Sequence, residues 1–241
     1  MAVGNSTISV NSVLSEVNSR LHRSIRPYLE PGKLIPDPDD LCIGDVILTR
    51  PVANGGSNRT AAAITALQAN MGHSAENARW THVCLYIGEH HLIEANVTAI
   101  PGAKPSAENF LCTGVRVTCT MEYASHRHLC VLRHPALAHH PQRFNVARYG
   151  LMEAAVNPRY YDVAGALISA VSAKWAAKHR RKRAHKSTIC TEFALECLVM
   201  GGTVLEAPYR DIATETRFIY PADFLDLAPL EQAEIQYRTI I

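Results

Sequence analysis

Cys190 is the residue whose setting most readily supports chemistry. It lies in the segment 185–202, HKSTICTEFALECLVMGG, where apolar residues begin to recur at helical spacing. Ser187 or Thr188 can cap such a helix, and the glycine pair at 201–202 can end it in a left-handed conformation. The free N–H groups and the dipole of the first helical turn favour a thiolate, which a nucleophilic cysteine requires. The alternative is that Cys190 serves as a small apolar residue of the core.

The remainder of this helix is predicted to be half-buried. Phe193 and Cys197 share an apolar face with Cys190, whereas Glu192 and Glu196 are expected on the opposite, solvent-facing side. Ordinary core helices show the same pattern, so a catalytic role for the cysteine also requires a base elsewhere in the chain.

Twelve histidines are candidates for that base, and position favours His82, which opens a predicted strand directly after a loop. A ring at a sheet end can face a pocket, although many histidines in such places have no catalytic role. If the Gly-Glu-His segment at 88–90 is a three-residue connection, residues 84 and 94 pair, and His82 and Glu94 share a face within reach of each other. A two-residue turn instead places them on opposite faces. Glu94 lies among apolar residues, where an acid needs a partner, and it can orient the imidazole.

These residues are carried by short strands in the middle of the chain with helices on either side. A turn followed by a strand is predicted at 41–50, and further strands at 81–88, 91–97, 114–120 and 128–133. Helices are predicted at 10–29, 58–72, 145–157, 162–178 and from residue 190, with a closing turn and strand around YPADFLDLA. No alternation of strand and helix typical of parallel sheets is visible, which disfavours Rossmann and barrel folds and favours an α+β domain.

The strand and helix segments resemble a known family. IGDVILTR, THVCLYIG and LIEA are similar to the strand core of the NlpC/P60 papain-like cysteine hydrolases, in which a GD pair opens one strand and the base begins the next. In that family a third polar residue comes twelve positions after the base, which is the separation of His82 and Glu94. The segment STICTEFALECL follows this core instead of preceding it, an order that resembles the circularly permuted YiiX/YaeF-like branch. YPADFLD is similar to the closing stretch of the family.

The resemblance implies an α+β, permuted papain-like fold, a small antiparallel sheet packed against helices. Residues 1–40 are then an N-terminal helical extension and linker, and 41–241 are the catalytic domain. It also implies a Cys190 nucleophile, a His82 base and a Glu94 orienting acid that work through a thioester without a cofactor. This chain departs from the family at Cys84, where glycine is usual, and at Glu94, where the unpermuted enzymes often have histidine.

Three functions are compatible with this pattern. The leading prediction is a cysteine amidase or peptidase that acts on peptides, including those of peptidoglycan. The permuted layout is related to that of the lecithin retinol acyltransferases, so a lipid-directed acyltransferase or thioesterase is an alternative. The third hypothesis is a non-enzymatic papain-like scaffold, because Cys84 narrows the space beside His82.

Other charged and ligand-forming residues limit the classes of partner. The net charge of +2 argues against a general polyanion binder, and the basic segment 178–186 is either a solvated loop or a rim for an anionic substrate or surface. No aromatic residue interrupts it, which argues against nucleic-acid binding by stacking. Tyr161 and Arg181 are candidate substrate-binding residues. We expect no metal site, because neither the histidine-rich stretch 125–140 nor the seven cysteines show metal-ligand spacing.

The N-terminal segment contains no apolar core of a signal peptide, and no run of residues is long and apolar enough to suggest a membrane span. We therefore expect synthesis and folding in a reducing cytoplasm. Export by a specialised secretion system, with residues 1–40 facing an adaptor, is the alternative expectation.

Overall fold

A mixed α/β architecture with a largely antiparallel sheet is present in the computed structural model, which describes residues 34–51, 59–96, 114–120, 123, 127–155, 159–162, 187–201, 219–227 and 229–239. The main sheet has the order β8-β7-β5-β4-β3-β2-β6-β9, and only its β7–β8 pair is parallel. Its strands are β2 (Val46–Pro51), β3 (His82–Gly88), β4 (His91–Asn96), β5 (Gly114–Cys119), β6 (Arg127–Arg133), β7 (Tyr160–Tyr161), β8 (Ser187–Thr188) and β9 (Glu231–Gln232). The five central strands confirm the predicted strands to within a few residues, and β2 follows a turn at residues 43–44, as predicted.

The β3–β4 hairpin combines a two-residue turn with a bulge. Residues 89–90 both have positive φ, 48° and 63°, as the tight turns of hairpins require. Tyr86 lies opposite Leu92, but the next pair is Gly88 with His91, so one extra residue is inserted in β3. Gly88 has a φ of 106°, a conformation that glycine adopts without strain.

The bulge determines which side chains share a face of the hairpin. The prediction of a three-residue connection was wrong in its turn but right in its register, because Leu85 pairs with Ile93 and the next residues along are therefore Cys84 and Glu94. A two-residue turn without the bulge would have shifted the register by one residue and turned Glu94 away from His82. The inserted residue thus keeps His82 and Glu94 on one face.

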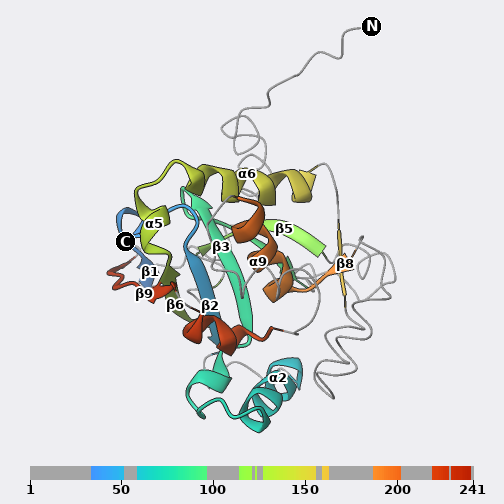
Figure 1. Cartoon of the computed structure of the whole chain (residues 1–241). Coiled ribbons are helices and arrows are strands. Elements are labelled where there is room, and N and C mark those ends of the chain that lie inside the picture. The colour runs from blue at the N-terminus through green and yellow to red at the C-terminus, as the bar shows by residue number, and fades with distance from the viewer. Residues whose placement is uncertain are drawn as a thin grey trace, which may run out of the picture.

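Two helices cover one face of this sheet. Helices α6 (Gln142–Ala155) and α9 (Cys190–Met200) lie side by side across the central strands (Figure 1). They bury the main core of the described chain against the sheet, with Phe193, Leu198 and Ile93 among its residues. Close approach is possible because a Cβ at Gly150 would already lie 3.2 Å from Ile93. A Cβ at Gly201 would lie 2.4 Å from the Val146 side chain.

The two ends of α9 differ from the prediction. Its N-cap is Ile189, which makes no side-chain capping bond, because Ser187 and Thr188 form β8 and pair with β7. At the other end Gly201 has a φ of −68° rather than a left-handed value. The glycine there is explained by the close packing of α6, which leaves no room for a side chain.

The opposite face of the sheet buries a second, smaller apolar cluster. It includes Ile47, Cys84, Tyr86, Leu92 and Val131 from the strands, together with Leu41 and Tyr123 from the segments around them. Because side chains alternate along a strand, Cys84 and Leu92 lie on the face away from α6 and α9. The central strands are therefore buried on both faces.

Helix α2 (Arg59–Asn70) lies at the end of the sheet where β3 begins (Figure 1). The fully buried side chain of Gln68 donates hydrogen bonds of 2.8 Å to the carbonyls of Ala78 and Trp80 and accepts one of 2.8 Å from the N–H of Ala222. It thereby joins α2 to the 3-10 helices η3 (Asn77–Arg79) and η4 (Pro221–Asp226). The predicted turn at YPADFLD is this second 3-10 helix, and the strand that follows is β9.

Smaller elements complete the described structure. Strands β1 (Leu34–Pro36) and β10 (Tyr237–Thr239) form a separate antiparallel pair, and Arg238 binds Asp37 and Asp39 next to η2 (Pro38–Asp40). Residues 34–40, assigned to the linker from the sequence, thus pack against the C-terminal strand. Helix α5 (Pro135–Ala138) precedes α6. The helices predicted at 10–29 and 162–178 lie outside the described residues. Among the described helices, none has the length and apolar character needed to cross a membrane.

Candidate active site

Cys190 is the first residue of α9, and its side chain is buried. It lies close enough to His82, at the start of β3, for the two side chains to affect each other's charge. The first N–H groups of a helix have no acceptor within the helix, so they are available to an anionic group beside the sulfur. The structure therefore brings together the two residues that the sequence predicted as nucleophile and base.

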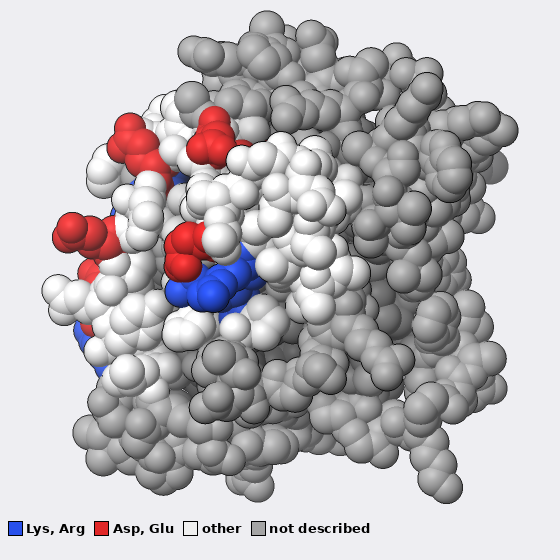
Figure 2. Space-filling model, turned by 90° about the horizontal axis from the view of Figure 1, so that it is seen from below, with Lys and Arg blue, Asp and Glu red and all other residues white. Residues whose placement is uncertain are grey.

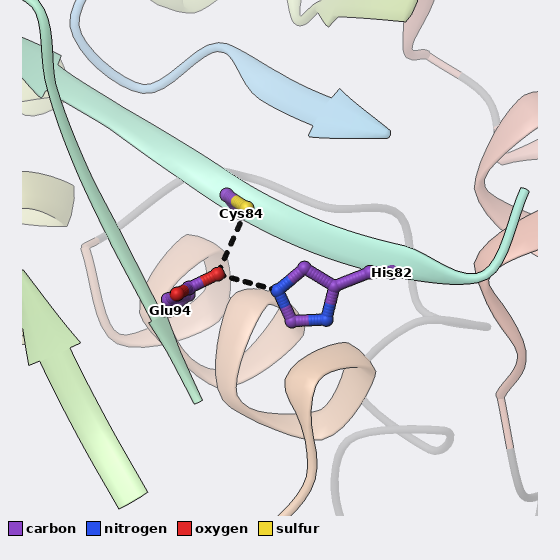
Figure 3. A group of neighbouring side chains, drawn as sticks. All are labelled: His82, Cys84 and Glu94. Carbon is purple, nitrogen blue, oxygen red and sulfur yellow. Dashed lines mark hydrogen bonds and ion pairs between the residues drawn. The ribbon is translucent and has the colours of Figure 1, made fainter. Parts of the chain in front are cut away.

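Glu94 lies on the other side of the His82 ring. The Nε2 atom of His82 is 2.5 Å from Oε2 of Glu94, and the carboxylate is completely buried (Figure 3). This contact occupies Nε2 and leaves Nδ1 as the ring nitrogen available to Cys190. Cys190, His82 and Glu94 thus form one connected series of side chains, as a nucleophile, a base and an orienting acid require.

The carboxylate of Glu94 is held by donors that the sequence analysis did not identify. Arg116, directly opposite on β5, donates from Nε to Oε1 at 2.7 Å, and Asn96 donates to the same oxygen at 3.2 Å. The hydroxyl of Tyr123 donates to Oε2, and its ring stacks on that of His82 with centroids 5.8 Å apart. The charges of Arg116 and Glu94 suggest a cross-strand pair, but only if the β4–β5 register is known.

Cys84 does not displace the histidine. Its thiol donates to Oε2 of Glu94 at 3.3 Å, beside the contact from His82 (Figure 3). Cys84 therefore lies in the space beside His82, as predicted, and the histidine–carboxylate contact is present next to it. Burial, followed by the charge of Glu94, raises the pKa of Cys84 to about 12, so this thiol stays protonated at neutral pH.

The electrostatics of the site favour a charged pair. Burial alone would raise the pKa of Glu94, but the charges of His82 and Arg116 and the hydrogen bonds from His82 and Tyr123 hold it well below its usual range. Burial would likewise lower the pKa of His82, and negative charge on Cys84, Cys190 and Glu94 raises it well above its usual value. Since Cys84 is neutral at neutral pH, Glu94 is the permanent charge that holds the proton on the ring.

Tyr161, predicted to bind substrate, lies near Cys190. It lies on β7, which pairs with β8 just before the start of α9, so its hydroxyl is near the thiol of Cys190. Burial of its hydroxyl, and then the charge and hydrogen bond of Cys190, raise its pKa well above the usual value, so the phenol keeps its proton. Arg181, the other predicted substrate-binding residue, lies outside the described residues, as does the rest of the basic segment 178–186.

Two acidic residues of α9 depart from the predicted solvent-facing side. Glu192 is buried in the first turn, and Glu196 is only partly exposed. Arg159 explains the second case, because its guanidinium contacts Glu196 at 2.6 Å and Glu153 of α6 at 2.5 Å. These charges join α6, α9 and the segment that leads into β7, which helps to position the start of α9 relative to Tyr161.

The described surface near η3 contains little uncompensated positive charge. Viewed from below, it is mostly uncharged, with one group of basic side chains beside acidic ones (Figure 2). Among the described residues there, Arg50 binds Glu76 and stacks on Trp80, and Arg79 lies 3.7 Å from the same carboxylate. This part of the chain therefore gives no support to an anionic partner.

The buried group of His82, Cys84 and Glu94 is also a potential set of metal ligands. One donor atom from each lies within 4.8 Å of the other two. The sequence analysis had considered metal sites only in the histidine-rich stretch and in cysteine pairs. These three residues lie at alternate positions on two paired strands, a spacing that indicates a site only when the hairpin register is known.

Comparisons of the chain with protein-family models, with curated proteins and with solved structures found no match.

Proposed function

We propose that this protein is a cysteine hydrolase that cleaves an amide or ester bond through a thioester on Cys190, as expected for an amidase or peptidase of the permuted NlpC/P60 type. The observation that supports this most strongly is the connected series Cys190, His82 and Glu94. A buried cysteine of purely structural role has no need of a charged histidine–carboxylate pair beside it. Burying the carboxylate of Glu94 completely costs desolvation free energy, even with several hydrogen-bond donors around it. This cost favours a functional role for the buried charge.

In this mechanism the Cys190 thiolate attacks the carbonyl carbon of the substrate. The backbone N–H groups at the start of α9 stabilise the oxyanion, and the protonated hydroxyl of Tyr161 supplies a second donor. His82 then gives its proton to the leaving amine or alkoxide, and Glu94 keeps the ring oriented. Water, deprotonated by His82, attacks the thioester and releases the acid and the thiolate.

The test is to trap the thioester. The protein is incubated with peptide amides, including peptidoglycan-derived peptides, and with phospholipid vesicles, and acid-quenched samples are examined by intact and peptide mass spectrometry. The proposal expects an acyl mass on Cys190 from a peptide substrate, and its loss in His82→Ala. Cys197→Ser, a buried thiol on the same helix, is the matched control and should still form the adduct.

Two results would overturn or redirect the proposal. An acyl adduct formed only from phospholipid would replace the peptidase with the lipid-directed alternative. Turnover of a peptide by Cys190→Ala at the wild-type rate would remove the thioester mechanism altogether.

A further inference from the structure

The group of His82, Cys84 and Glu94 has a composition that a catalytic triad does not require. A triad uses His82 and Glu94, whereas the thiol of Cys84 is an additional soft ligand on the same face of the hairpin. All three side chains are buried, and their donor atoms converge on one point next to Oε2 of Glu94. Imidazole, thiolate and carboxylate together are the ligand types that Zn²⁺ takes in proteins.

The distances are compatible with an ion of this size. Nε2 of His82 is 2.5 Å and Sγ of Cys84 is 3.3 Å from Oε2 of Glu94. Zinc bonds of roughly 2.0–2.3 Å in tetrahedral geometry place neighbouring ligand atoms about 3–4 Å apart. The three side chains therefore need to move only slightly for an ion to take the place of the hydrogen bonds that now join them. Arg116 binds the other oxygen, Oε1, while Oε2, which also accepts a hydrogen bond from Tyr123, would exchange its contacts with His82 and Cys84 for the ion.

We propose that His82, Cys84 and Glu94 form a binding site for Zn²⁺, with water as the fourth ligand. Binding displaces the thiol proton of Cys84 and the proton between His82 and Glu94, and both are released to solvent. The charges of Glu94 and the Cys84 thiolate balance the ion, and the adjacent Arg116 leaves the site with one net positive charge. This binding claim does not depend on the proposed hydrolase function.

The consequence for catalysis does rest on the proposed function. A zinc-bound histidine donates its other ring N–H, so Nδ1 of His82 already has a proton and cannot take one from Cys190. Zinc also occupies the oxygen through which Glu94 orients the ring. Zn²⁺ is therefore an inhibitor of this site, and alkylation of Cys190 should become slower as the ion binds.

Binding is tested on the full chain with Zn²⁺ alone, in competition with a chromophoric chelator. The wild type should bind one equivalent, and Cys84→Ser should weaken that binding at least about tenfold. Cys130→Ser, another buried sheet thiol, should leave it unchanged. Unchanged affinity in Cys84→Ser, or binding that disappears in Cys190→Ser, would overturn the proposed site.

A second measurement avoids the risk that a variant of Cys84 fails to fold. Cys190→Ser, which keeps Cys84, is loaded with Co²⁺ and examined for a cobalt–thiolate charge-transfer band. The band should persist, because Cys84 remains free to coordinate, and its absence would contradict the assignment. If Cys190 shows no activated reactivity but this band is present, the proposed function fails and the metal site stands.

Discussion

Glu94→Gln removes the charge on which the site depends while keeping the size of the side chain. The carboxylate is fully buried and accepts hydrogen bonds from His82, Arg116, Tyr123 and Cys84. An amide at this position places an N–H₂ group against donors and removes the carboxylate that faces the guanidinium of Arg116. Breaking a buried ion pair by removing one partner typically costs about 3–5 kcal/mol.

For a domain of this size, each kcal/mol shifts Tm by roughly 2–4 °C, so Glu94→Gln should lower Tm by about 6–20 °C. Calorimetry and urea unfolding measure both quantities. The control is Glu231→Gln, because Glu231 is exposed and should change the free energy of unfolding by no more than about 0.5 kcal/mol. A loss below about 1 kcal/mol in Glu94→Gln would refute the reasoning that the carboxylate is charged and paired in the folded protein.

Three further predictions concern packing, buried polar contacts and pH. Gly201→Ala should destabilise the fold by about 1–3 kcal/mol in urea unfolding, because the new Cβ meets Val146 at 2.4 Å; stabilisation through helix propensity would contradict this packing. Gln68→Met should cost about 2–5 kcal/mol, since it leaves two carbonyls and one N–H without their 2.8 Å partner, and a neutral effect would show that water replaces the amide. Burial lowers the pKa of His134 below its usual 6.5, so the unfolded state binds more protons and stability falls as the pH drops below about 6.5. His134→Gln should reduce the dependence of the free energy of unfolding on pH between pH 7 and 5. An unchanged dependence would rule out this histidine as a contributor.

The elements that contain the site were predictable because each has a strong local signal. The alternating apolar residues of β3 and β4 and the helical spacing of α9 depend on neighbours in sequence. The separation of His82 and Glu94 also pointed to one face, although the prediction reached the right register through the wrong turn. A bulge is not visible in the sequence, and it corrected the shift that the two-residue turn introduced.

The contacts across larger separations could not be predicted. Arg116 meets Glu94 because of the β4–β5 register, and the connection 97–113, although it contains Pro101-Gly102, is too long for a turn type to fix that register. Tyr123 lies beyond the end of β5, outside any periodic pattern. The close contact of Gly201 depends on how α6 packs on α9, and the burial of Glu192 likewise depends on the tertiary structure.

The central claim is that His82 activates Cys190. It is tested most directly by alkylating the native protein with iodoacetamide between pH 5 and 9 and measuring the rate at each cysteine separately. The account predicts that Cys190 reacts first, that His82→Ala slows its reaction at least about tenfold, and that the buried thiols of Cys84 and Cys197 remain unmodified. Labelling that spares Cys190, or that proceeds at the same rate in His82→Ala, would contradict it.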